Sequence, residues 1–100
     1  MKVTVSPQAL RRFNESLDLL YPVADPRWRD QIIDRVFDHV ELLSRYPGLG
    51  AIEPQLDHLE MGHRRLIVGH FKIIYRILPT EIIVLDIFDS RQDPDRMLKP

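Results

Sequence analysis

Three arginines and a histidine in the second half of the chain could support chemistry on a phosphodiester. His63, Arg64 and Arg65 are consecutive, and Arg91 follows a long apolar run. Cleaving RNA through its 2′-hydroxyl requires a base that accepts this proton and cations that stabilise the crowded phosphate. A histidine can take the first role near neutral pH, and arginines can take the second. These four residues are therefore the candidate catalytic set.

Each arginine also has a structural interpretation. Arg64 begins a predicted strand, where it can contact a target or pair with Asp86 or Asp89 at the sheet edge. Arg91 lies two residues after Asp89 and two before Asp93, so it can cap its own loop through carboxylate hydrogen bonds. It also leaves a strand for a surface loop, where a partner can reach it. The residues alone leave both interpretations open.

The composition narrows the other possibilities. The 100 residues include no cysteine, so there is no disulfide framework, thiolate metal site or cysteine nucleophile. The four histidines show no zinc-ligand spacing, and no glycine-rich phosphate loop is present. We therefore expect no metal and no cofactor. The net charge of −1 argues against sequence-specific DNA binding by the chain alone, although a local arginine patch is compatible with it.

Length and hydropathy give three further expectations. A chain of 100 residues has the size of one domain, so residues 1–100 are expected to form a single domain. No apolar run approaches the roughly 20 residues that a membrane helix needs. The N-terminus lacks a basic-then-apolar signal. The protein is therefore expected to be cytoplasmic, without a membrane partner.

Two amphipathic helices are predicted in the first half of the chain. Ser6 and Pro7 form an N-cap followed by a proline at the first helical position, and Pro22 ends this helix. Asp25-Pro26 repeats the signature, and Pro47-Gly48 stops the second helix. About five residues join the two helices, which predicts an antiparallel hairpin. The apolar stripes are Leu10, Phe13, Leu17 and Leu20 in the first helix, and Trp28, Ile32, Val36, Val40 and Leu43 in the second.

Strand patterns surround the helices. A short strand is expected at residues 2–6, and three more at 64–68, 71–78 and 82–88, whereas 51–62 has no clear period. Short connections make the last three strands antiparallel neighbours, with the two most apolar in the middle of the sheet and the helices on one side. The order strand, helix, helix, strand, strand, strand defines an α+β domain. Arg64 and Arg91 are expected to share one edge of its sheet.

Three motifs in order resemble the RelE/ParE toxin superfamily, and in particular its ParE-like branch. The first is the turn Pro47-Gly48-x-Gly50. The second is Arg64-Arg65-Leu66-Ile67-Val68-Gly69-His70-Phe71-Lys72-Ile73-Ile74-Tyr75, which is similar to the arginine-x-leucine, turn and aromatic-basic-aliphatic-aliphatic-tyrosine signature. The third is Arg91-Gln92-Asp93-Pro94. The resemblance follows nearly the whole chain in element order, and residues 64–94 carry its specific part.

This resemblance implies a type II toxin that a cognate antitoxin, encoded beside it, neutralises. ParE-type members inhibit DNA gyrase without nuclease activity, whereas RelE-type members cleave mRNA on the ribosome. The tail after Arg91 has no tyrosine or histidine, Met97 stands about where a RelE-like tyrosine would fall, and residues 56–60 before Arg64 are acidic. We therefore expect gyrase inhibition. A ribosome-dependent mRNA endonuclease that uses Arg64, Arg65, Arg91 and His63 is the alternative, and an inactive relic is a third possibility.

The expected positions of the residues suggest which of them contact partners. Arg64, Arg91 and Arg96 are the expected target contacts. Trp28 and Tyr75 are the expected antitoxin contacts. Both aromatic residues also lie on apolar stripes, so packing in the core is the competing interpretation for each of them.

Overall fold

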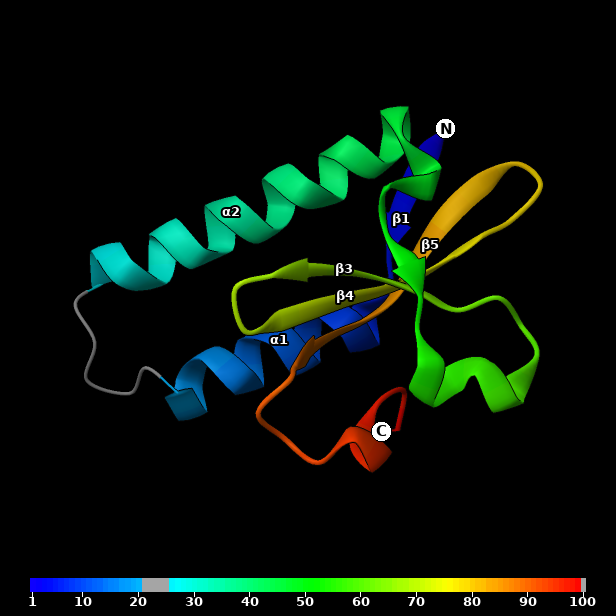
Figure 1. Cartoon of the computed structure of the whole chain (residues 1–100). Coiled ribbons are helices and arrows are strands. Elements are labelled where there is room, and N and C mark those ends of the chain that lie inside the picture. The colour runs from blue at the N-terminus through cyan, green and yellow to red at the C-terminus, as the bar shows by residue number, and fades with distance from the viewer. Residues whose placement is uncertain (21–25, 100) are drawn as a thin grey trace.

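The computed structural model describes residues 1–20 and 26–99, which form a five-stranded sheet and two helices that share an apolar core with it (Figure 1). The predicted α+β order is confirmed. The helices and strands are β1 (Lys2–Val5), α1 (Pro7–Leu20), α2 (Pro26–Arg45), β2 (Ala51–Ile52), β3 (Arg64–Val68), β4 (Phe71–Ile77) and β5 (Glu81–Asp89). Three short 3₁₀ helices are η1 (Pro47–Leu49), η2 (Pro54–Leu59) and η3 (Pro94–Arg96).

Helix α1 begins at the predicted cap. The Ser6 side-chain oxygen accepts a hydrogen bond from the backbone N–H of Ala9 at 3.0 Å, which satisfies one of the free donors at the helix start. Phe13 is buried as predicted, but Leu10 is 39 % exposed, so its place on the inner stripe was wrong. Small residues allow the helix to sit close to the sheet, because Ala9 and Ser16 are both buried. The predicted stop at Pro22 lies outside the described residues.

Helix α2 runs in the opposite direction to α1, as Figure 1 shows, so the predicted hairpin is confirmed. Its second half supplies the core through Val36, Val40 and Leu43, all buried. The predicted cap at Asp25 lies outside the described residues. Trp28, in the first turn of α2, is 64 % exposed. Its predicted place in the core is therefore wrong.

The sheet has the strand order β1-β5-β4-β3-β2. The three antiparallel strands β3, β4 and β5 are confirmed, with β4 and β5 inside the sheet. Two further strands enlarge it. β1 pairs with β5 in parallel, and the two residues of β2 pair with Arg64 and Arg65. The sheet is therefore mixed and five-stranded instead of three-stranded.

A β-bulge in β5 sets which side chains face each side of the sheet. Ile74 pairs with Asp86 and Tyr75 with Val84, so Leu85 is the extra residue. As a result Val84 and Ile87, three residues apart, both join the core under the helices. The other face carries a smaller buried cluster of Leu56, Ile74, Phe88 and Met97, which η2 and the C-terminal segment cover.

The two helices and the sheet meet at one aromatic residue. The ring of Phe13 lies edge-on to Phe71 of β4, with centroids 5.1 Å apart, and edge-on to Phe37 of α2, at 6.1 Å. The α-amino group of Met1 also donates to the carbonyl of Ser44 at 2.8 Å, which places the N-terminus beside the end of α2 (Figure 1). None of the helices in the described residues is long and apolar enough to cross a membrane.

Candidate functional site

Arg64 begins β3, and its guanidinium lies over the turn that follows α2. One nitrogen, Nη2, donates to the carbonyl of Gly50 at 2.5 Å and approaches that of Gly48 at 3.4 Å. The predicted pairing of Arg64 with Asp86 or Asp89 is wrong, because both carboxylates have other cationic partners. The guanidinium of Arg64 therefore helps to fix the turn.

Tyr75 supports the same turn from below. Its side chain is fully buried, its hydroxyl donates to the carbonyl of Pro47 at 2.8 Å, and it accepts from the N–H of Gly50 at 3.0 Å. A Cβ at position 50 would lie 2.3 Å from the carbonyl oxygen of Arg65, so only glycine fits there. Tyr75 offers no surface to an antitoxin. The core interpretation holds, and its predicted role as an antitoxin contact is wrong.

Arg65 points to the opposite face of the sheet from Arg64, because neighbouring side chains alternate along a strand. Its Nη1 lies 2.9 Å from a carboxylate oxygen of Glu53, whose other oxygen lies 2.6 Å from Nζ of Lys72. Glu53 is fully buried. Two cations therefore balance the charge of a buried carboxylate, and Arg65 is engaged in this cluster.

Arg91 caps its own loop, as one of the two interpretations predicted. Its backbone N–H and its Nε both donate to Oδ1 of Asp89, at 2.9 and 3.2 Å, and its Nη2 lies 3.1 Å from Oδ2. The carboxylate is fully buried, whereas the arginine side chain is 45 % exposed. Asp89 thus holds the guanidinium in one orientation at the surface.

The expectation that Arg64 and Arg91 share a sheet edge is wrong. Arg64 pairs with Tyr75, whereas Asp89, two residues before Arg91, pairs with Phe71. These positions are four residues apart along β4, which is about 13 Å, and β3 and β5 flank β4 on opposite sides. Two successive antiparallel connections make β3 and β5 run in the same direction, so the start of one and the end of the other lie at opposite ends of the sheet.

His63 is buried directly before β3, and only 4 % of its surface is exposed. Its Nδ1 has no hydrogen-bond partner among the described residues. Burial, and then the positive charge of Arg76, lower the pKa of His63 below its usual value of 6.5. The imidazole is therefore neutral at physiological pH, but it is enclosed and lies away from Arg91.

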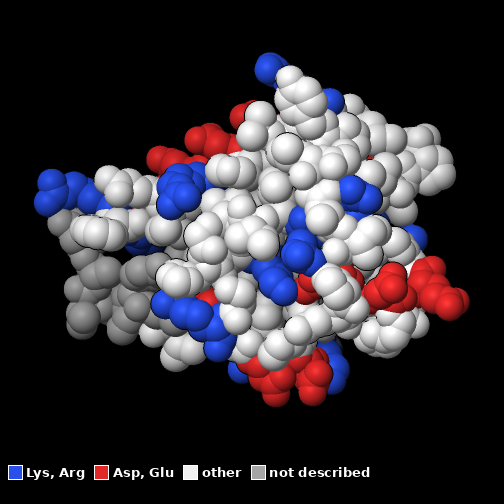
Figure 2. All heavy atoms as spheres, in the orientation of Figure 1, with Lys and Arg blue, Asp and Glu red and all other residues white. Residues whose placement is uncertain are grey.

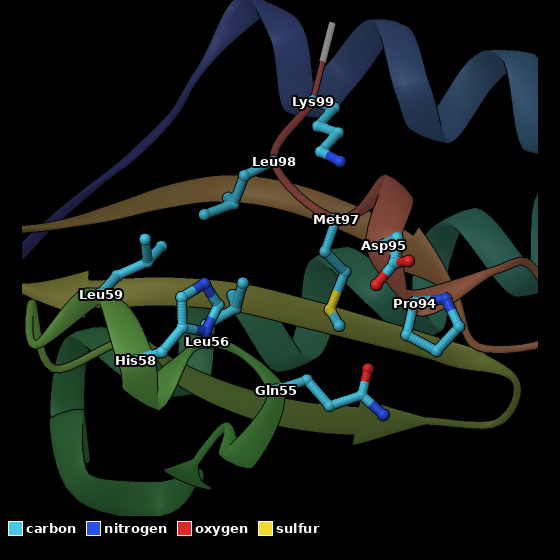
Figure 3. Close-up of a pocket in the computed structure, with 9 residues that line it drawn as sticks. All are labelled: Gln55, Leu56, His58, Leu59, Pro94, Asp95, Met97, Leu98 and Lys99. Atoms are coloured by element: carbon cyan, nitrogen blue, oxygen red, sulfur yellow. The ribbon is translucent and has the colours of Figure 1, made fainter.

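The C-terminal segment forms one wall of a groove on the sheet face opposite the helices. The groove has a volume of about 600 Å³ and lies between η2 and the residues from Pro94 to Lys99. Figure 3 shows the side chain of Met97 pointing into this space toward Leu56. Met97 is 4 % exposed, so the position expected to align with a RelE-like tyrosine packs in an apolar cluster. Arg96, in contrast, is exposed.

Sequence reasoning overlooked the buried carboxylates that organise these segments. Glu53 and Asp86 are both fully buried and each lies within 3.0 Å of a cation. Asp86 also accepts from the backbone N–H of Leu98 at 2.8 Å. Burial has the largest effect on the pKa of Asp86 and raises it. Hydrogen bonds from the backbone and the charge of Arg12 oppose this effect. The signal available was Asp86 itself, an acid with apolar neighbours on both sides in β5.

The described residues contain no group of three or more His, Asp or Glu side chains placed to hold a metal ion. The surface of the described residues does present guanidinium groups, an exposed tryptophan and an apolar groove, and such features can contact a macromolecule.

The strand, the two helices and the mixed sheet that follows them are consistent with the RelE/ParE fold. Residues 3–94 match the family described as the ParE toxin of type II toxin-antitoxin system, parDE. The chain therefore belongs to the ParE toxin family. Comparison with curated proteins found none that matches.

Proposed function

We propose that this ParE toxin acts by inhibiting DNA gyrase and does not cleave RNA. The observation that supports this proposal is the dispersal of the candidate nuclease set. Arg64 braces a turn on one face of the sheet, Arg65 neutralises Glu53 on the other, and Arg91 lies at the far end. Cleavage of a phosphodiester needs a base and cations within hydrogen-bond reach of the same substrate group, and these residues do not converge.

The histidine of the candidate set, His63, supports the same argument. His63 is buried, so a substrate hydroxyl cannot approach its ring without displacing β3 or the segment before it. The tail that follows Arg91 supplies no replacement, since its residue at the expected position is the buried Met97. A toxin without a catalytic set has to act by binding, which is how a gyrase inhibitor works.

Two surfaces are proposed to make the partner contacts. Arg91 and Arg96 are exposed on the segment that leaves β5, and we retain them as target contacts. Trp28 is 64 % exposed at the start of α2, and a large aromatic side chain in that position is a typical anchor for a protein partner. We assign Trp28 to the cognate antitoxin.

Expression in growing bacterial cells without the antitoxin tests the proposed function. Gyrase inhibition predicts a DNA-damage response while cellular mRNA remains intact. Primer extension on the same cells checks the alternative, because ribosome-dependent cleavage leaves cuts in phase with codons. Codon-phased cuts without a DNA-damage response would refute the proposal. No growth defect at all would indicate the inactive relic.

A further inference from the structure

The exposed side of α1 and the C-terminal segment form a continuous basic strip. One shallow hollow is lined by Gln8, Arg11, Arg12, Glu15, Arg96 and Lys99. A second hollow shares Arg12, Glu15 and Arg96 with it and continues toward Gln92. The strip therefore follows α1 from one end to the other, about 16 Å between residues 8 and 19 at 1.5 Å per residue.

The charge of this strip is opposite to that of the rest of the protein. Four cations line the strip together with one carboxylate, that of Glu15. Because Arg12 is paired with the buried Asp86, the strip carries a formal charge of +2. The whole chain carries −1, so the remainder carries a formal −3. Figure 2 shows acidic groups at the right, lower and upper left margins of the face drawn there, with basic groups among them. The small net charge of the whole chain thus conceals a local excess of cations along the strip.

The three outer cations of the strip are not neutralised locally. Among residues 1–20 and 26–99, the side chains of Arg11, Arg96 and Lys99 form no ion pair. The acids nearest in sequence serve other purposes, since Asp93 caps η3 by accepting from the N–H of Asp95. Asp95 itself lines the apolar groove on the other side of the C-terminal segment.

The C-terminal segment is held firmly against α1. The amide of Gln8 donates to the carbonyl of Leu98 at 3.2 Å, and Asp86 accepts from the N–H of Leu98 at 2.8 Å. Arg12 pairs with the same Asp86 at 3.0 Å, and Met97 is buried beside them. The fold therefore presents Arg96 and Lys99 at fixed positions next to α1, which reduces the entropy lost when they bind a ligand.

We infer that this strip binds the phosphate backbone of the DNA that gyrase holds. The inference rests on the proposed function. Duplex DNA carries one charge per roughly 1.7 Å of its axis, so a linear strip of this length faces several phosphates. Arginine also forms bidentate hydrogen bonds with phosphate oxygens. Three contacts are few for binding DNA alone, but they add to contacts with gyrase itself.

The test measures the affinity of the toxin for gyrase alone and for gyrase loaded with duplex DNA, each at about 50 and about 200 mM salt. Three phosphate contacts predict a logarithmic salt slope of about −2.7, or roughly a forty-fold loss between these salts. We expect this loss only with DNA-loaded gyrase. The variant Arg11→Glu/Arg96→Glu/Lys99→Glu should lose both the DNA-dependent gain and the salt dependence.

A second triple variant, Lys2→Glu/Arg35→Glu/Arg45→Glu, changes the net charge equally at exposed positions outside the strip, and it should behave like the parent. Equal affinity of the parent for gyrase with and without DNA would overturn the inference while leaving gyrase inhibition intact. The inference would also be overturned if the strip variant lost affinity for the antitoxin but kept the DNA-dependent affinity for gyrase. That result would assign the strip to an acidic segment of the antitoxin. Failure of the parent to bind gyrase in either state would instead refute the proposed function.

Discussion

The substitution Tyr75→Phe isolates the contribution of one buried hydroxyl to the turn after α2. The hydroxyl donates to the Pro47 carbonyl at 2.8 Å and accepts from the Gly50 N–H at 3.0 Å, inside a fully buried side chain. Each hydrogen bond contributes about 1 kcal/mol, and a buried group left without a partner costs more. We therefore expect the free energy of unfolding to fall by about 2–3 kcal/mol.

Urea unfolding followed by circular dichroism measures this loss. With a typical slope for a small domain, the midpoint should fall by about 1–2 M while the slope stays unchanged. Tyr46→Phe is the matched control, because Tyr46 lies beside the same turn but is 58 % exposed, and it should leave the midpoint unchanged. A loss below about 0.5 kcal/mol in Tyr75→Phe would show that the hydroxyl does not hold the turn.

Three further predictions concern the turn, a buried histidine and the antitoxin surface. Gly50→Ala should lower the free energy of unfolding by at least about 1–3 kcal/mol in the same urea assay, since the new Cβ would lie 2.3 Å from the carbonyl oxygen of Arg65. Gly48→Ala is the control. Its Cβ would meet no atom within 4 Å, so the free energy of unfolding should stay unchanged. Burial lowers the pKa of His63. The stability that this residue contributes is therefore fully present above pH 6.5 and is lost as the pH falls through the folded pKa. The free energy of unfolding, measured against pH, should decrease in this range, and His63→Asn should remove the decrease. Trp28→Ala should weaken antitoxin binding by more than about tenfold without changing the unfolding midpoint, and an unchanged titration would exclude this anchor.

The helices and the three antiparallel strands could be predicted because their signals are local. Ser6 and Pro7 mark the start of α1 through cap chemistry. β4 and β5 are apolar on both faces and joined by short turns, which is typical of neighbouring inner strands. The parallel pairing of β1 with β5 joins residues about 80 positions apart, and no local pattern encodes it. β2 has two residues, too few for any periodicity.

Trp28 shows why a stripe on a helix does not guarantee burial. It is on the same side of α2 as Ile32 and Val36, but only the second half of that helix supplies fully buried residues. Leu10 is the corresponding case on α1, where the small residue Ala9 occupies the buried position instead. Periodicity gives the direction of a side chain, whereas burial depends on what lies opposite it.

The positions of the arginines could be predicted only in part, and the predicted sheet edge shared by Arg64 and Arg91 was an avoidable error. The capping of the Arg91 loop by Asp89 was one of the two interpretations that their spacing left open. The shared edge with Arg64 did not follow, because two antiparallel turns already require β3 and β5 to run in the same direction. The partners of Arg64 and Arg65 could not be predicted, since Gly50 lies in a turn and Glu53 in a segment without a clear period.

The most direct test of the central claim uses purified components. The toxin, released from its antitoxin, is added to purified gyrase, plasmid DNA and ATP, and supercoiling and DNA breaks are followed on gels. The proposed function predicts loss of supercoiling and an accumulation of broken plasmid. Undisturbed supercoiling, together with codon-phased cleavage of mRNA by the same preparation on translating ribosomes, would contradict it.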